Sequence, residues 1–105
     1  MQFDVHENPS PRMREQYPFV VDIQSDLLSG LPSRMVIPLA LSGLNKAELP
    51  HRLCPAFIVK SQRVILLPFE AAPLDKRLLK KAIISLRDQA HNLIAALDAV
   101  TAISQ

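Results

Sequence analysis

Glycine is scarce in this chain, since Gly30 and Gly43 are its only glycines among 105 residues. Two isolated glycines cannot form the glycine-rich loop that cradles a phosphate group in nucleotide-binding proteins. They also leave few places for the two-residue hairpin turns that need positive φ angles. Nine prolines stand beside these two glycines. We therefore expect strands joined mainly by longer loops that proline stiffens.

Cysteine and long apolar runs are also lacking. Cys54 is the single cysteine, so no disulfide can form within the chain and nothing indicates secretion. The first ten residues are too polar for a signal peptide. No apolar run approaches the roughly 20 residues that cross a bilayer. We predict a cytoplasmic protein without a membrane partner.

A strong charge of one sign is absent, because 12 Lys and Arg residues face 10 Asp and Glu residues, for a net charge of +2. This near balance gives no support to direct nucleic-acid binding. Hydrophobic residues make up 49% of the chain and charged residues 21%, an ordinary globular mixture. The length fits one domain over residues 1–105.

The first two thirds of the chain have the pattern of β-strands. Apolar and polar residues alternate in short segments, and polar, proline-containing stretches such as 7–16 separate them. Pro38 cannot donate a hydrogen bond within a sheet, which places its strand at an edge or at a bulge. The expected strands are 2–6, 17–25, 34–41, 54–59 and 63–69, with the last two forming a hairpin around 60–62.

The last third has helical spacing. From Leu74 onward, apolar residues recur every three or four positions as far as Val100, and the secure part of the helix is 86–103. Asp75 is one candidate for the helix cap, and Ser85 with Asp88 forms a second capping pattern. Beyond residue 93 the helix is apolar on more than one side. A twofold partner would cover it, which predicts a homodimer.

Few residues carry a pattern that indicates chemistry. His6, His51 and His91 lie far apart, without the short spacing of metal ligands, so we expect no metal. Cys54 lies in an apolar strand, where a buried structural thiol is favoured over a nucleophile. Asp22 and Asp26 could act as an acid–base pair, although turn capping and ordinary exposed aspartates are the commoner explanations.

The sequence also contains one cluster of basic residues. It is either a solvated helix face or loop, or a patch that contacts an acidic partner. Its members are Lys76, Arg77, Lys80 and Lys81.

A longer match points to a family. The segment 19–40, FVVDIQSDLLSGLPSRMVIPLA, resembles two paired strands of the CcdB toxins. MQF at 1–3, LCP at 53–55, Ala-Pro at 72–73 and AALD at 95–98 follow in the matching order. The resemblance covers essentially the whole chain, and is weakest in 42–52 and 61–85.

The resemblance implies a mainly β fold with a C-terminal α-helix, an SH3-like barrel with a five-stranded antiparallel sheet and a small extra sheet. It implies a homodimeric toxin of a type II toxin–antitoxin module, as in plasmid maintenance, with no cofactor and no enzymatic activity. Toxins of this family bind the DNA gyrase A subunit and trap gyrase on cleaved DNA. A cognate CcdA-like antitoxin neutralises them.

The resemblance also assigns candidate residues for gyrase binding. Leu27 and Leu28 stand where the family has an apolar pair after Gln-Ser-Asp, and Asp98 stands at a polar position of the last helix. The C-terminal end departs from the plasmid toxin, which has tryptophan, glycine and an apolar residue at its last three positions. Candidates in this tail are Thr101, Ala102, Ile103 and Ser104, followed by one extra residue, Gln105.

Two other functions stay open at this stage. The altered tail is compatible with a dimeric binding protein of the same fold that is not toxic or has another target. An endoribonuclease that cleaves messenger RNA would need an acid–base pair and a basic groove, and the sequence shows neither clearly.

Overall fold

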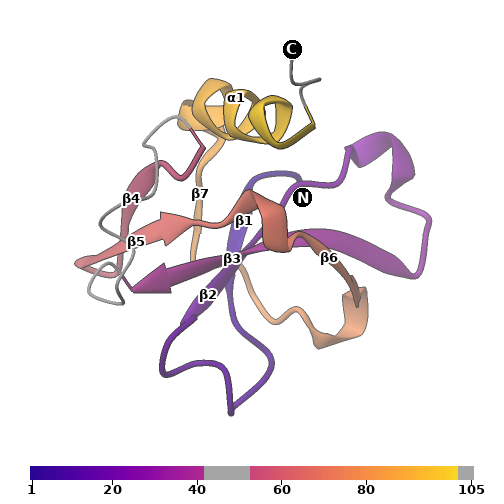
Figure 1. Cartoon of the computed structure of the whole chain (residues 1–105). Coiled ribbons are helices and arrows are strands. Elements are labelled where there is room, and N and C mark those ends of the chain that lie inside the picture. Colours follow the sequence, from indigo (N-terminus) through magenta and orange to yellow (C-terminus); the bar gives the residue numbers. More distant parts are fainter. Residues whose placement is uncertain (42–52, 102–105) are drawn as a thin grey trace.

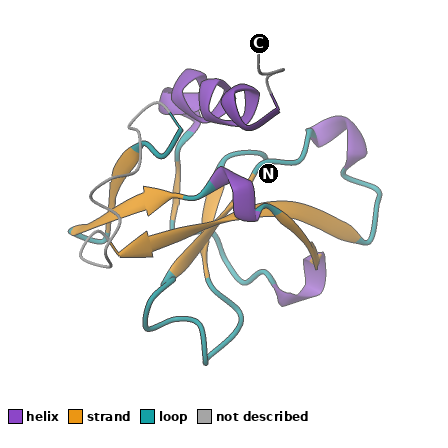
Figure 2. Ribbon diagram, in the orientation of Figure 1, coloured by secondary structure: helices purple, strands orange, loops and turns teal. Residues whose placement is uncertain are grey.

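A computed structural model describes residues 1–41 and 53–101. Seven strands and one α-helix account for its regular structure, with four short 3-10 turns between them (Figure 2). The strands are β1 Asp4–Glu7, β2 Phe19–Asp22, β3 Ser33–Leu41, β4 Ala56–Val59, β5 Gln62–Leu66, β6 Ala72–Asp75 and β7 Ile84–Ser85. The helix is α1 Ala90–Thr101, and the turns are η1 Asp26–Leu28, η2 Pro68–Glu70, η3 Lys76–Leu78 and η4 Arg87–Gln89.

All paired strands are antiparallel and belong to one curved, barrel-like sheet (Figure 1). The strand order is β4-β5-β3-β2-β1-β7, and β6 pairs with β3 beside this path. The helix α1 lies across one side of the sheet (Figure 1). The mainly β fold with a C-terminal helix is thus confirmed.

The alternation seen in the sequence builds the core. On β2, Phe19 and Val21 turn inward, and α1 adds the fully buried Leu93 and Ala96, which lie three positions apart on one helix face. The central core residues are Phe3, Val5, Phe19, Val21, Ile37, Leu39, Phe57, Val59, Val64, Leu66, Leu86, Leu93 and Ala96.

Pro38 lies in the most extensively paired strand, so its predicted edge position is wrong. Residues 33–36 of β3 pair with β6, and residues 39–41 pair with β5. Pro38 lies between the segments that pair with β6 and with β5. At this position the sheet needs no hydrogen bond from a backbone N–H. Its carbonyl still accepts the Leu67 N–H at 3.2 Å.

The helix begins later than its sequence spacing predicted, since α1 begins at Ala90 rather than at residue 86, and residues 102–103 of the predicted helix lie outside the described part. Residues 72–75 and 84–85 form β6 and β7 instead, because their backbones pair with β3 and β1. Leu86 reaches the core from the turn before the helix rather than from a helical stripe. Asp75 does act as a cap, but of the short turn η3, where it accepts the Arg77 N–H.

The β4–β5 hairpin has a two-residue turn, contrary to the expectation of longer loops and of a three-residue connection. Val59 pairs with Gln62, and Lys60 and Ser61 between them have φ angles of 50° and 64°. Such left-handed angles are usual for glycine and cost other residues about 1 kcal/mol or more.

Ser61→Gly is therefore expected to raise the free energy of unfolding by about 0.5–1 kcal/mol, because it relieves the strained turn. Urea denaturation at fixed protein concentration measures the change. Ser29→Gly is the matched control, since Ser29 is exposed with a right-handed φ of −63° and its replacement should destabilise. A loss of stability in Ser61→Gly equal to that of the control would contradict this account of the turn.

Candidate protein-binding surface

The β2–β3 loop, residues 23–32, presents leucine side chains to solvent. Leu27 is 94% exposed, Leu28 49% and Leu31 45%. Leucines in a loop either cover a core or meet a partner, and none of these three is buried. An almost fully exposed leucine beside two half-exposed ones forms an apolar patch of the kind found at protein interfaces.

The tip of this loop is held by local hydrogen bonds. The Ser25 hydroxyl caps η1 by accepting the Leu27 N–H at 3.2 Å. The Asp26 carboxylate accepts the Gln2 N–H at 3.0 Å, which ties the loop to the N-terminal segment. Leu27 therefore lies exposed on a turn that hydrogen bonds hold in place.

Gln24 braces the base of the loop from inside. Its side-chain nitrogen donates to the carbonyls of Leu28 at 3.2 Å and Ser33 at 3.1 Å. Its side-chain oxygen accepts the Met35 N–H at 3.0 Å. The sequence did not lead us to name Gln24 as a candidate residue. Its position on the strand face that points away from the core was a usable signal.

A buried ion pair lies beneath the loop. Arg34 Nε donates to Asp22 Oδ2 at 2.8 Å, and both side chains are almost fully buried. Arg34 Nη2 also donates to the Gln24 carbonyl at 3.1 Å, and Asp22 Oδ1 accepts the Gln24 N–H at 3.0 Å. Asp22 and Asp26 are thus both engaged in holding the loop, which favours the structural explanation over an acid–base pair.

The start of the C-terminal helical segment is attached to the same loop. Arg87 Nη2 lies 3.7 Å from Asp26 Oδ2 and donates to the Gln2 carbonyl at 3.4 Å. Asp98 and Thr101 are exposed further along α1. Asp98 lies eight residues after Ala90, which corresponds to about 12 Å along the helix axis.

The candidate residues thus form two groups. Leu27 and Leu28 lie together on η1, and Asp98 and Thr101 lie together near the end of α1, which points to the same side of the view as the β2–β3 loop (Figure 1). The Thr101 hydroxyl donates to the carbonyl of Leu97 at 3.3 Å, as exposed helical threonines often do. Ala102, Ile103 and Ser104 lie outside the described residues.

The histidines and the cysteine do not form a site. His91 is exposed, and the ring of buried His6 is held by a 2.6 Å hydrogen bond from Nδ1 to the Lys80 carbonyl. His51 is not among the described residues. Within residues 1–41 and 53–101, no three His, Cys, Asp or Glu side chains are grouped as metal ligands would be. Cys54 is buried among apolar residues, as expected.

The basic cluster lies on the connection between β6 and β7 rather than on a helix face. Its four side chains are exposed. Arg77 Nη2 lies 2.7 Å from Asp75 Oδ2, and hydrogen bonds from the Arg77 side chain and backbone lower the pKa of Asp75 to about 2. The Asp75 carboxylate therefore stays ionised well below its usual range, and its contribution to stability is lost only as pH falls from about 4 towards 2.

A family model with the description CcdB protein matches residues 2–102, which include the whole sheet, the β2–β3 loop and α1. The chain belongs to the CcdB family. No curated protein matches it. Membership in the CcdB family implies a toxin of a toxin–antitoxin module that acts on gyrase. No helix in the described part of this CcdB-family chain is long and apolar enough to cross a membrane.

Proposed function

We propose that this CcdB-family protein binds the DNA gyrase A subunit, traps gyrase on cleaved DNA and is neutralised by a cognate CcdA-like antitoxin. The observation that carries the proposal is Leu27, 94% exposed on a loop that Gln24, Ser25 and Asp26 hold in place. Family membership points to gyrase as the target, and the exposed loop is a surface available to contact it.

The energetics of this loop suit an anchor for a partner. Burying an exposed leucine side chain at an interface is worth about 1.5–3 kcal/mol. A loop that is already fixed by hydrogen bonds loses little conformational freedom on binding, so more of this free energy appears as affinity. The same leucines contribute little to the fold of the free protein.

A homodimer is part of the proposal. The outer side of α1 carries exposed apolar side chains, with Ile94 49% and Val100 39% exposed. Covering them with a second copy would bury apolar surface and would present two β2–β3 loops to the target. A twofold interface of this kind repeats the same contacts in both copies.

Expression in gyrase-proficient cells tests the proposal, with and without a co-expressed antitoxin. We expect growth arrest and gyrase trapped on cleaved DNA, both relieved by the antitoxin. If neither a growth defect nor trapped cleavage complexes arise, the gyrase proposal fails. In that case the dimeric binding protein with another target becomes the better explanation, because Ala102 replaces the tryptophan of the plasmid toxin.

The tail itself decides between these two functions. Ala102→Trp combined with Ile103→Gly, Ser104→Ile and deletion of Gln105 restores the plasmid-type end. If these changes create toxicity that the natural chain lacks, the altered tail explains the loss, since an aromatic anchor at an interface is often worth ~2 kcal/mol or more. An endoribonuclease is disfavoured because Asp22 and Asp26 are engaged in holding the loop.

A further inference from the structure

β4 forms one edge of the sheet, with β5 as its only partner among the described strands. Natural edge strands are usually protected from further pairing by proline, by charge or by shortness. The other exposed edges follow this rule, since β6 contains Pro73 and β7 has two residues. The four residues of β4, Ala-Phe-Ile-Val, include neither proline nor a charged side chain, and Ile58 is 61% exposed.

The register shows which backbone groups of β4 face outward. Val59 and Gln62 flank a two-residue turn and so form a hydrogen-bonded pair. Pairs alternate along antiparallel strands, so Phe57 also bonds to β5, whereas the N–H and C=O groups of Ala56 and Ile58 point away from it. The bond from Leu66 N–H to the Pro55 carbonyl, at 2.9 Å, fits this alternation.

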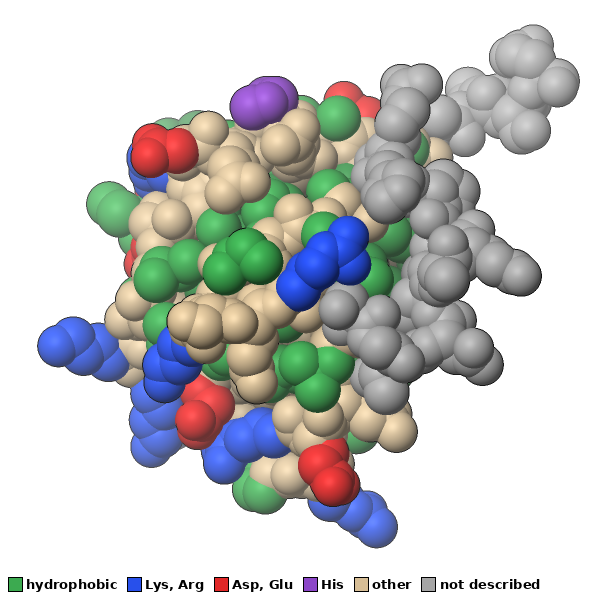
Figure 3. All heavy atoms as spheres, turned by 90° about the vertical axis from the view of Figure 1, so that its left-hand side faces the viewer, with side chains coloured by type: hydrophobic (Ala, Val, Ile, Leu, Met, Phe, Trp, Pro, Cys, Tyr) green, Lys and Arg blue, Asp and Glu red, His purple; other side chains and the backbone are tan. Residues whose placement is uncertain are grey.

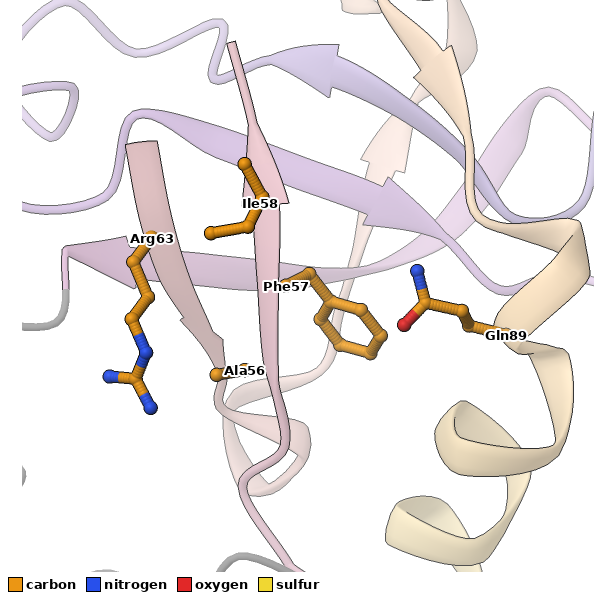
Figure 4. A pocket seen from close by; sticks show the side chains of 5 residues that line it. All are labelled: Ala56, Phe57, Ile58, Arg63 and Gln89. Atoms are coloured by element: carbon orange, nitrogen blue, oxygen red, sulfur yellow. The ribbon is translucent and has the colours of Figure 1, made fainter. Parts of the chain in front are cut away.

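Next to these outward groups is an open pocket lined by Ala56, Phe57, Ile58, Arg63 and Gln89 (Figure 4). The side chains of Phe57 and Gln89 point toward each other on one side of β4, and Ile58 and Arg63 lie on the other side (Figure 4). On this face of the molecule, hydrophobic side chains reach the surface with an isolated basic side chain among them (Figure 3). An added strand would therefore meet the exposed Ile58 side chain on one side, and the Gln89 side chain next to buried Phe57 on the other.

The charged side chains of β4, β5 and the turn between them, all within the described part of the chain, are basic. Arg63 lies directly across from Ile58, is exposed, and has no ion-pair partner among residues 1–41 and 53–101. Lys60 at the turn adds a second exposed basic group. A carboxylate at the matching position of an added strand would complement both.

We propose that the edge of β4 binds an extended acidic segment of a partner polypeptide as an additional strand. The segment pairs through the backbone of Ala56 and Ile58, and its carboxylate meets Arg63. A second copy of this chain is a poorer occupant, because a twofold β4–β4 pairing would bring two sets of like charges, Arg63 and Lys60, to one edge. The β4 edge shares no residue with the β2–β3 loop, so this proposal does not depend on gyrase as the target.

An NMR titration tests the proposal with the acetylated, amidated peptide Thr-Val-Glu-Val-Thr and isotope-labelled full-length protein. We expect saturable shifts of the Ala56 and Ile58 amide signals. Arg63→Glu should weaken binding at least fivefold and should reverse the preference toward a peptide with lysine in place of glutamate. Arg12→Glu, the same charge change at an exposed residue of the 7–16 loop, should leave binding unchanged.

Ile58→Pro gives a second, independent variant. It removes an N–H that points away from β5, so the β4–β5 ladder keeps its bonds while peptide pairing is lost. If Ile58→Pro does not fold, the Arg63→Glu titration still decides. The proposal is overturned if no saturable shift occurs at millimolar peptide, or if Arg63→Glu behaves like Arg12→Glu. It is also overturned if the same amide signals move with protein concentration alone, which would make a second copy the occupant.

Discussion

Leu27→Asp is expected to abolish the proposed growth arrest and to lower the proposed affinity for the gyrase A subunit at least tenfold. The reason is that Leu27 is the most exposed leucine of the braced loop, and a charge at an apolar contact adds a desolvation cost to the lost burial. Anchor residues of this kind are often worth ~2 kcal/mol or more, which exceeds a tenfold change in affinity. Growth assays and binding to a purified gyrase A fragment measure both effects.

The control is a variant that changes an exposed apolar residue elsewhere. Ile58→Asp, on the β4 edge, should retain toxicity, whereas Leu27→Asp should lose it. Because Leu27 is 94% exposed, its replacement should change the free energy of unfolding by no more than about 0.5 kcal/mol, so a folding defect would not explain the loss. A Leu27→Asp protein that arrests growth as strongly as the natural one would remove this loop from the proposed gyrase contact.

Local patterns were sufficient to predict much of the sheet. The alternation in 17–25 and 34–41 placed β2 and β3, and the apolar runs around 60–62 placed the β4–β5 hairpin. Each of these segments places apolar side chains in the core, and the residue types of the segment indicate that burial directly. The ends were less accurate, since β2 covers only Phe19–Asp22.

Long-range backbone pairing could not be predicted in the same way. Residues 74–75 and 84–85 lie in the stretch with helix-like spacing of its apolar residues, yet they belong to β6 and β7 because β3 and β1 offer them hydrogen bonds. Such bonds join residues far apart in the chain and leave no local trace. Pro38 illustrates the same limit, since its tolerance in a central strand depends on where β6 ends and β5 begins.

The candidate surface was partly visible in the sequence. Three leucines in a turn with Gly30 and Pro32 indicated that the turn either covers the core or contacts a partner. In the structure, the side chains of all three leucines are exposed. The support beneath them was not visible, because Gln24 and Arg34 act through contacts that only the folded loop brings together. The residues that hold a contact residue in place are thus harder to predict than the contact residue itself.

Arg34→Met is expected to lower the free energy of unfolding by about 3–5 kcal/mol. It removes the guanidinium that lies 2.8 Å from the buried Asp22 carboxylate and leaves the exposed N-terminal ammonium of Met1, at 3.6 Å, as a more distant cationic neighbour. Urea denaturation at fixed protein concentration measures the change. The matched control, Arg77→Met, breaks the exposed pair with Asp75 and should cost far less than Arg34→Met, because water solvates the carboxylate that remains.

A double variant separates the pair from the individual side chains. Asp22→Leu combined with Arg34→Met should be less destabilised than Arg34→Met alone, since it removes the uncompensated charge. It should nevertheless bind gyrase more weakly than the natural protein, because the Arg34 bond to the Gln24 carbonyl and the Asp22 bond to the Gln24 N–H are both lost. Recovery of stability without recovery of binding would mean that the buried pair serves mainly to position Leu27. If the double variant binds gyrase as tightly as the natural protein does, the buried pair contributes to stability alone.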